Sequence, residues 1–351
     1  MRFKTSIRDI RTLSKLIASL SSLGKVAWVR LDDDDVRITI IPEIGTQVWS
    51  TITIDSIFED FILESAAPNN TINLELPLPP LYRALKSALN ATSASMRLTK
   101  RDNIPLLSLT IVTNTVTSGN ASNGSFLQNE AAPDPFGEDV FREESLGVGI
   151  GRDRETIVTH DIPVRVLTAA SVEGLMEPRV REPDVHVILP SLVQLKAISD
   201  RFTKLATATA AGSSTSRGIV SNNSSSNAPK LELSANMYGN LKLSIATDAL
   251  NISSVWTGLV NPELDPAQIE GGEDELQNHP SVKLKQAGPD AWATVRVDGR
   301  DWGRVLSVGR LGGRVIACFA DEHALILYVY LPNDGGVEDS VLTYYISSFS
   351  L

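Results

Sequence analysis

Three neighbourhoods of the sequence place a histidine close to an aspartate, which is a pairing used for metal ligation and for general acid-base catalysis. Each pair falls on a different segment, and none is accompanied by an HExxH, GxSxG or phosphate-loop motif. We therefore interpret these residues as polar groups near strand ends, and we predict no enzyme, no metal site and no cofactor. The pairs are His160 with Asp161, Asp184 with His186, and Asp321 with His323.

Three further features have the appearance of binding motifs. Residues 32–35 form a run of four carboxylates between two apparent strands, but they lack the spacing and the glycine of an EF-hand, so we predict a solvated hairpin turn. The GVGIG run at 147–151 precedes no strand-to-helix transition and is interpreted as linker. Cys318 is the one cysteine of the chain, which excludes an intramolecular disulfide, and we predict that it is buried in an apolar strand.

Length and composition indicate an ordinary globular protein with two domains. The chain has 351 residues, of which 42% are hydrophobic and 21% are charged. Charged residues interrupt every apolar stretch near the N-terminus, and no later run reaches the roughly 18 apolar residues that a membrane span needs. We therefore expect a soluble intracellular protein that makes no contact with a membrane.

Positive charge is concentrated on the segments with helical spacing. Four windows, 8–23, 78–90, 190–206 and 298–310, together contain eleven Lys or Arg and four Asp, whereas the net charge of the whole chain is −10. This segregation predicts a positive surface that contacts phosphates, and the lack of a major-groove recognition motif indicates that it does not read bases. The predicted DNA-facing residues are Arg11, Lys15, Arg83, Lys86, Lys196, Arg201, Lys204, Arg300 and Arg304.

The order of predicted elements occurs twice along the chain. Strand, helix, strands, helix and further strands fill residues 1–168, and the same order fills 185–351, with an extended connector at 169–184. Few helices among many strand-like runs favour the α+β class, with two similar domains. Three polar stretches break the apolar pattern and are predicted to be mobile insertions. They lie at about 115–155, 207–228 and 261–289.

Several segments resemble one known family. The opening MRFK, LYRALKSALNA at 81–91, IVTHDIPVRVL at 157–167, VHVILP at 185–190 and WTGLVNP at 256–262 are similar to the Hus-one subunit family of the DNA-damage checkpoint sliding clamp. The resemblance covers both modules in register. It implies the sliding DNA clamp fold, in which two similar domains each place two helices on β-sheets and the helices line a central DNA hole.

The resemblance also implies the partners and the location of the protein. It predicts a heterotrimeric ring with clamp subunits of the Rad-nine and Rad-one families, loaded by a dedicated checkpoint clamp loader. The ring is expected to act in the nucleus on double-stranded DNA at single-strand junctions and to recruit checkpoint and repair proteins. Composition alone leaves open a homotrimeric processivity clamp of the replicative type, which has the same fold.

A strand at 157–167 is the predicted contact with the next subunit. Its apolar residues alternate, and Pro163 lacks the N–H that an interior strand would need, so we predict an edge strand. In the clamp family this strand pairs with the neighbouring subunit, and Trp256 is either an anchor for that partner or a half-buried core residue. The predicted interface residues are Val158, His160, Ile162, Val164, Val166, Ile252 and Trp256.

The connector at 169–184 is a second predicted contact. In replicative clamps a groove beneath the corresponding connector receives repair and replication proteins. By this resemblance, Leu175 and Met176 are expected to border a groove for repair-protein peptides.

Overall fold

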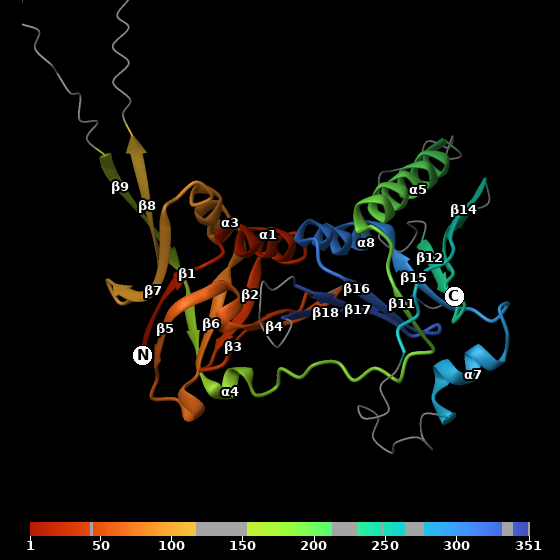
Figure 1. Ribbon diagram of the computed structural model, residues 1–351, viewed down its shortest axis with the longest axis horizontal. Coiled ribbons are helices and arrows are strands. Elements are labelled where there is room, and N and C mark those ends of the chain that lie inside the picture. Colours follow the sequence, from red (N-terminus) through yellow and green to blue (C-terminus); the bar gives the residue numbers. More distant parts are fainter. Residues whose placement is uncertain are drawn as a thin grey trace, which may run out of the picture.

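The structure is a computed structural model that describes residues 1–42, 45–116, 153–212, 230–247, 249–263, 277–331 and 340–349. Three antiparallel sheets carry a row of helices along one concave side (Figure 1). This mixture of strands and helices agrees with the predicted α+β class. The central parts of the three predicted insertions, at 117–152, 213–229 and 264–276, lie outside the described residues.

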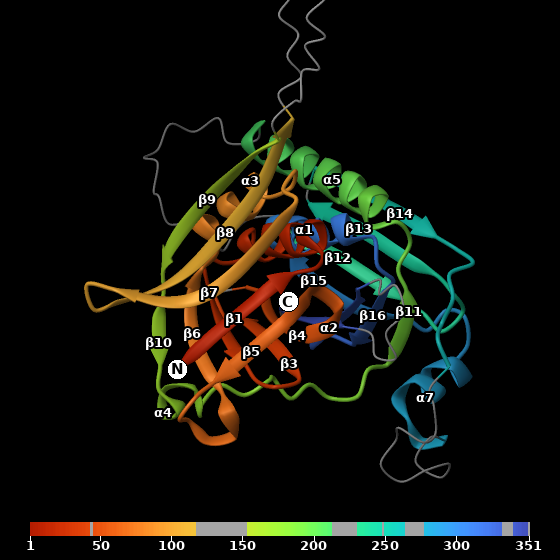
Figure 2. The same cartoon turned by 60° about the vertical axis from the view of Figure 1, so that its left-hand side comes forward.

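The described part of the N-terminal half contains ten strands and two of the longer helices. Its five-stranded sheet has the order β5-β1-β7-β8-β9, and Figure 2 shows these strands in front. The elements are β1 (Arg2–Ile7), α1 (Ile10–Ser21), β2 (Val26–Leu31), β3 (Asp35–Ile40), β4 (Gln47–Thr53), α2 (Ile54–Ile57), β5 (Phe58–Glu64), η1 (Pro68–Asn70), β6 (Ile72–Pro77), α3 (Leu78–Ser87), β7 (Ser93–Arg101), β8 (Ile104–Val116), β9 (Asp153–Pro163) and β10 (Arg165–Leu167).

The C-terminal half follows the connector, which begins with the short helix α4 (Ala169–Val172). Its four-stranded sheet has the order β14-β13-β12-β15. The elements are β11 (Val185–Ile188), α5 (Leu192–Gly212), β12 (Lys230–Ala235), β13 (Leu241–Thr247), β14 (Leu250–Trp256), α7 (Pro280–Gln286), β15 (Ala293–Asp298), α8 (Gly299–Val305), η3 (Leu306–Leu311), β16 (Val315–Ala320), β17 (Ala324–Tyr330) and β18 (Val341–Ser347).

Local sequence explains where the helices begin. The Asp9 side chain accepts a hydrogen bond from the Thr12 N–H at 2.9 Å and caps α1, and the Asp298 side chain caps α8 in the same way. Helix α3 has prolines in its first turn, where the missing N–H would have no partner inside the helix. The apolar stripes of these helices are buried, as their periodicity predicts.

A nine-stranded sheet connects the two halves. Its order is β10-β6-β2-β3-β4-β18-β17-β16-β11, so strand β4 of the N-terminal half pairs directly with β18 of the C-terminal half. One continuous cluster of buried apolar residues runs through both halves. The repeated order of elements did not predict this junction, because it depends on pairing between strands nearly 300 residues apart.

Four helical elements lie next to one another on the concave side, in the spatial order α3, α1, α8 with η3, and α5 (Figure 1). Helices α5 and α8 approach closely because Gly299 and Gly303 face α5. A Cβ at Gly299 would collide with the Thr203 side chain, and one at Gly303 would lie 3.0 Å from the Asp200 Oδ1. All four predicted helical windows therefore contain helix on one common face.

The structure corrects the ends of the predicted insertions. Helix α5 continues to Gly212, because the sequence LATATAAG is rich in the strong helix former alanine. Strands β8 and β9 remain paired as far as Val116 and Asp153. Helix α7 occupies part of the range 261–289, where Pro280 begins the helix and the His279 side chain caps it.

Candidate nucleic-acid interface

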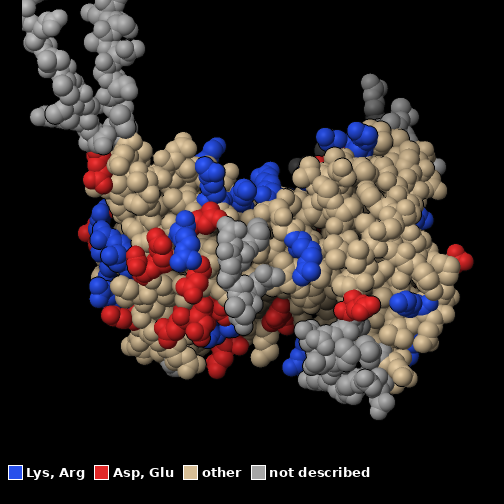
Figure 3. All heavy atoms as spheres, viewed as in Figure 1, with Lys and Arg blue, Asp and Glu red and all other residues tan. Residues whose placement is uncertain are grey.

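Eight of the nine predicted DNA-facing side chains are exposed on the concave row of helices. Figure 3 shows Lys and Arg gathered along the corresponding edge of the molecule, over α3, α1 and α5. Because the apolar stripe of each helix packs on a sheet, the opposite, cationic face is directed to solvent. The exposed residues are Arg11, Lys15, Arg83, Lys86, Arg201, Lys204, Arg300 and Arg304.

The few carboxylates of these helices are engaged locally. Asp9 and Asp298 cap helix N-termini, where a negative charge is favourable. Asp301 forms an ion pair with Arg304 at 3.0 Å. Burial, followed by the nearby Asp298, raises the pKa of the Asp301 carboxyl. The negative charge on this face is therefore small and lies mainly at helix ends.

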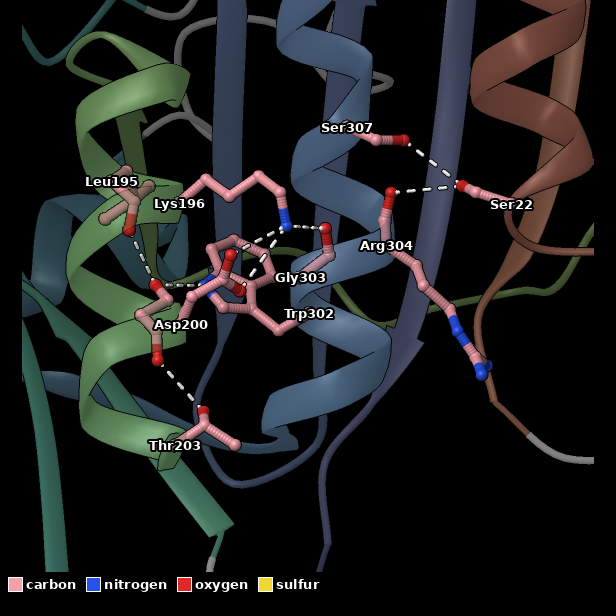
Figure 4. Close-up of polar contacts among 10 residues, drawn as sticks. Ser22, Leu195, Lys196, Asp200, Thr203, Trp302, Gly303, Arg304 and Ser307 are labelled. Atoms are coloured by element: carbon pink, nitrogen blue, oxygen red, sulfur yellow. Dashed lines mark hydrogen bonds and ion pairs between the residues drawn. The ribbon is translucent and has the colours of Figure 1, made fainter. Parts of the chain in front are cut away.

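Lys196 is the exception among the predicted residues. Its Nζ donates a hydrogen bond to the Gly303 carbonyl at 2.7 Å and lies 3.1 Å from an Asp200 carboxylate oxygen (Figure 4). The ammonium group thereby joins α5 to α8, and only 34% of the side chain is exposed. Its prediction as a free DNA-facing cation is corrected, because the close approach of the two helices gives its charge partners inside the protein.

Trp302 makes a second connection between the same helices. Its Nε1 donates to the Ser199 Oγ at 3.1 Å, and the Ser199 hydroxyl donates to the Leu195 carbonyl at 2.8 Å (Figure 4). The indole is buried, so its N–H needs this partner. Two side-chain hydrogen bonds thus join helices α5 and α8 on the concave face.

A groove of about 420 Å³ opens between α1, α3 and η3. Its cations are Arg11 and Lys15 of α1 and Arg310 of η3, and no Asp or Glu is among the described residues that line it. The predicted DNA-facing residues did not include Arg310, although the helical window 298–310 contains it. Its lining residues are Arg11, Ser14, Lys15, Ala18, Tyr82, Leu89, Asn90 and Arg310.

The predicted edge strand lies at one end of the molecule and β14 lies at the other (Figure 1). Strand β9 is the last strand of the five-stranded sheet and ends at Pro163, so the edge prediction for this part of the segment is confirmed. Strand β14 is the first strand of the four-stranded sheet. Each has one side without a partner strand in the part of the chain that the structure describes.

Burial corrects the predicted interface residues. The chain crosses from one sheet to another at Val164, because β9 belongs to the five-stranded sheet and β10 to the nine-stranded sheet. As a result, Ile162 and Val164 are buried in the subunit, with exposures of 2% and 7%, and cannot reach a partner. Ile157 and Val158 are the exposed apolar residues of β9, at 63% and 42%.

The other predicted interface residues differ in their burial and in their contacts within the subunit. Val166, Ile252 and Trp256 are partly buried and pack against the core of the subunit. His160 of β9 lies with its Nε2 3.0 Å from the Ser87 Oγ at the end of α3.

A groove of about 410 Å³ lies between the connector and the outer face of the nine-stranded sheet. Trp28, Trp49 and Leu175 are among its lining residues, whereas Met176 is not among them and is 78% exposed. The Tyr345 hydroxyl donates to the Glu177 carboxylate at 2.8 Å and attaches the connector to β18. Burial, followed by this bond, raises the pKa of the Tyr345 hydroxyl.

His186 and Cys318 form a polar contact inside the subunit. The His186 Nδ1 lies 3.2 Å from the Cys318 Sγ, and burial lowers the pKa of His186 to about 4. Cys318 is buried as predicted, and burial raises the pKa of its thiol to about 12. Across the described parts of the chain, no group of three or more His, Cys, Asp or Glu could hold a metal ion.

Two other sequence predictions concern a turn and membrane contact. Residues 32–35 form the predicted hairpin turn, in which the Asp35 N–H donates to the Asp32 Oδ1 at 2.7 Å. No helix among the described residues is long and apolar enough to cross a membrane.

Comparisons with known proteins agree with this arrangement. A family model described as "Hus1-like protein" matches residues 1–350. The chain is 36% identical over 350 residues to Checkpoint protein hus1 of Schizosaccharomyces pombe, covering 99% of both chains. It is 24% identical over 271 residues to Checkpoint protein HUS1 of Homo sapiens, covering 75% of this chain and 76% of the human protein.

Solved structures with the same fold are sliding clamps. The structure matches proliferating cellular nuclear antigen of Entamoeba histolytica with a TM-score of 0.56 and 12% identity, covering 99% of both chains. It matches PCNA of Thermococcus kodakaraensis with a TM-score of 0.57 and 14% identity, covering 99% of this chain and 100% of the other. At these identities the likeness shows the fold.

Proposed function

This chain belongs to the Hus1-like protein family and is a subunit of a checkpoint sliding clamp, and from that premise we propose that it encircles DNA as one of three different subunits. Its role in the ring is that of a scaffold without catalysis. Residues 1–168 and 185–351 act as its two clamp domains, with the connector 169–184 between them.

The observation that supports DNA contact is the row of exposed cations on the concave side. Eight Lys and Arg side chains of the four neighbouring helical elements are exposed, while most carboxylates of these elements cap helices or pair locally. Such a surface binds phosphates regardless of sequence, because it attracts the backbone and offers no recognition element to the base edges. A clamp that slides needs this kind of contact.

The free sides of β9 and β14 support ring closure by strand pairing between subunits. An unpaired strand edge offers N–H and C=O groups to a second chain, and head-to-tail contacts of this type close into a ring. Exposed Ile157 and Val158 on β9 and Val255 on β14 add apolar area beside these edges. The neighbours in this proposal are clamp subunits of the Rad-nine and Rad-one families.

The remaining partners belong to the same proposal. A checkpoint clamp loader places the ring on double-stranded DNA at single-strand junctions in the nucleus. Repair-protein peptides bind in the connector groove, whose floor contains Trp28 and Trp49 and whose rim contains Leu175. Two half-exposed indoles and an aliphatic rim suit an apolar peptide side chain.

A homotrimeric clamp is the alternative that the fold also allows. The family membership favours the heterotrimer, since the similar proteins are named as checkpoint proteins. Light scattering after size exclusion separates the two: the isolated chain is expected to be monomeric and to form a ring with the two partner subunits. A stable trimer of the isolated chain would contradict the heterotrimer.

The test of encirclement is topological. The assembled ring is loaded on a nicked circular plasmid and on the same plasmid after linearisation, and retention is measured by gel filtration at high salt. A ring around DNA is retained on the circle and slides off the ends of the linear form. Equal retention on both forms would contradict encirclement and would indicate ordinary surface binding.

A further inference from the structure

A buried histidine caps the N-terminus of α7. The His279 Nδ1 accepts a hydrogen bond from the Ser281 N–H at 3.2 Å and lies 2.7 Å from the Ser281 Oγ. Because a backbone N–H can only donate, Nδ1 carries no proton, and the neutral ring has its proton on Nε2. Ser, Thr, Asp and Asn are the usual caps, and their acceptors do not change with pH between about pH 5 and 8, where histidine gains its charge. This cap therefore depends on the protonation state of one ring.

The other nitrogen of the same ring faces a carboxylate of the connector. The His279 Nε2 lies 3.9 Å from the Glu182 Oε2. A protonated imidazole donates from both nitrogens and accepts at neither. When a proton from solvent adds to Nδ1, the Ser281 hydroxyl can reverse and accept, but the Ser281 N–H loses its acceptor. The same proton strengthens the attraction between the ring and Glu182.

The strand beside α7 contributes a second histidine, which does not compete for this proton. The His186 ring of β11 lies with its centroid 6.0 Å from the centroid of the His279 ring. Behind it, the Cys318 Sγ of β16 lies 3.2 Å from the His186 Nδ1. Burial, followed by the charge of His279, lowers the pKa of His186 to about 4 and raises the pKa of the Cys318 thiol, by burial, to about 12. Both groups therefore stay neutral while the pH falls from about 8 to 5.

The remaining charges near this end of the connector are engaged or exposed. Arg181 of the connector pairs with Asp184 at 2.9 Å and donates to the Asp321 carbonyl at 2.7 Å. Lys283 and Lys285 of α7 itself are exposed to solvent. Glu182 is thus the one carboxylate within ion-pair distance of the His279 ring among the described residues.

The C-terminal end of α7 has its own attachment. The Tyr238 hydroxyl donates to the Lys285 carbonyl at 2.8 Å, and the Ala287 N–H donates to the Lys283 carbonyl at 3.0 Å. Neither bond involves a group that titrates between about pH 5 and 8. A change in the charge of His279 should therefore act on the first turn of α7 and leave its last turn in place.

We propose that His279 is a protonation switch between α7 and the connector. The neutral ring accepts at Nδ1 and caps the Ser281 N–H. The protonated ring donates at both nitrogens, to the Ser281 Oγ and to Glu182, so that acid loosens the start of α7 and ties the end of the connector more closely to it. The switch does not depend on DNA contact or on ring assembly, because every group in it belongs to the isolated subunit.

Hydrogen exchange of the isolated chain tests the cap directly. The protection factor of the Ser281 amide, which is its exchange rate corrected for the intrinsic effect of pH, is expected to fall about fivefold between about pH 7.5 and 5.5, as for the loss of a helix cap. The Ala287 amide should keep its protection and serves as the reference within the same helix. Equal protection of Ser281 at both pH values would overturn the proposal.

Three variants identify the group that responds to pH. His279→Asn keeps an acceptor at the cap but removes the titration, so protection of the Ser281 amide should become independent of pH. Glu182→Gln removes the carboxylate that attracts the charged ring, and the loss of protection should move to lower pH. His323→Asn is the matched control, because it removes an exposed histidine and should behave as wild type. A wild-type pH response in His279→Asn would assign the effect to another group and contradict the switch.

A measurement on the wild-type chain covers the case in which a variant fails to fold. NMR of the four histidines with ¹⁵N in their rings distinguishes the two neutral tautomers from the charged form. At about pH 7.5 the His279 ring is expected to carry its proton on Nε2, and at the acid end of the titration on both nitrogens. A neutral ring with its proton on Nδ1 could not cap the Ser281 N–H and would overturn the proposal.

Discussion

His160 of β9 is hydrogen-bonded to Ser87 of α3, with 3.0 Å between Nε2 and Oγ. The Ser87 hydroxyl donates its proton to the Ala84 carbonyl at 2.7 Å, so the imidazole is the donor and carries its proton on Nε2. This contact ties the proposed subunit edge to a helix of the proposed DNA surface. His160, which is predicted for the subunit interface, is therefore bonded to the helix that carries the predicted DNA-facing residues Arg83 and Lys86.

Removal of this hydrogen bond should lower stability slightly, and the effects of the two substitutions that remove it should be coupled. His160→Ala and Ser87→Ala should each lower the free energy of unfolding by about 1 kcal/mol, and the double variant should lose less than the sum. Urea unfolding of the four proteins measures the coupling. Strict additivity would show that the bond does not contribute in solution.

A negative charge introduced by substitution at the subunit edge should have different effects at a buried and at an exposed position. Val164→Asp should lower the free energy of unfolding by about 3 kcal/mol or more, because a carboxylate would be buried without a partner. Ile157→Asp should leave unfolding within about 0.5 kcal/mol of wild type and should weaken co-purification with the neighbouring subunits. Circular dichroism and pull-down measure the two effects. Normal ring assembly by Ile157→Asp would argue against the β9 edge.

Substitution of two lysines of α5 should distinguish a side chain that stabilises the fold from one that contacts DNA. Lys196→Met should lower stability by about 1 kcal/mol through loss of the bond to the Gly303 carbonyl, with little change in the slope of log DNA affinity against log salt. Lys204→Met, which removes an exposed charge from the same helix, should lower the slope by about 0.9 and leave stability unchanged. Thermal melts and salt titrations of the assembled ring check both. The opposite pattern would restore Lys196 as a DNA contact.

Tyr345→Phe should release the connector from β18. The change removes the hydroxyl that donates to Glu177 and keeps the ring. Backbone amides at 173–180 should exchange hydrogen faster, while the strands of the nine-stranded sheet keep their protection. Tyr330→Phe is the control, since its ring contacts Arg314 and lies on another strand. Unchanged exchange at 173–180 would mean that apolar contacts alone hold the connector.

Acid should destabilise the fold through His186. Its pKa is lowered from 6.5 to about 4 in the folded state, first by burial and second by His279, so the unfolded chain binds the proton more tightly. The stabilising contribution is complete above pH 6.5 and is lost as the pH falls to about 4, up to about 3 kcal/mol in total. His186→Gln should remove this part of the pH dependence of urea unfolding. Parallel pH curves for the two proteins would rule out His186 as its source.

The local features of the chain could be predicted from the sequence. Amphipathic spacing and capping aspartates determine α1 and α8, Pro163 determines that β9 lies at an edge, and the apolar neighbours of Cys318 determine its burial. Each of these depends on residues within a few positions of one another. Periodicity, capping and a missing N–H act over that range, so no knowledge of distant segments is needed.

The tertiary structure decided which residues are available to a partner. Ile162 and Val164 are buried because the chain changes sheets between them and Val166, and Lys196 is engaged because α8, which lies 107 positions away, offers a carbonyl. Arg310 reaches the groove of α1 only because the two halves pack together through η3 and the β4–β18 pair. The alternation of apolar residues and the charge along a segment do not reveal such contacts. The contacts arise between elements that only the packed core brings together.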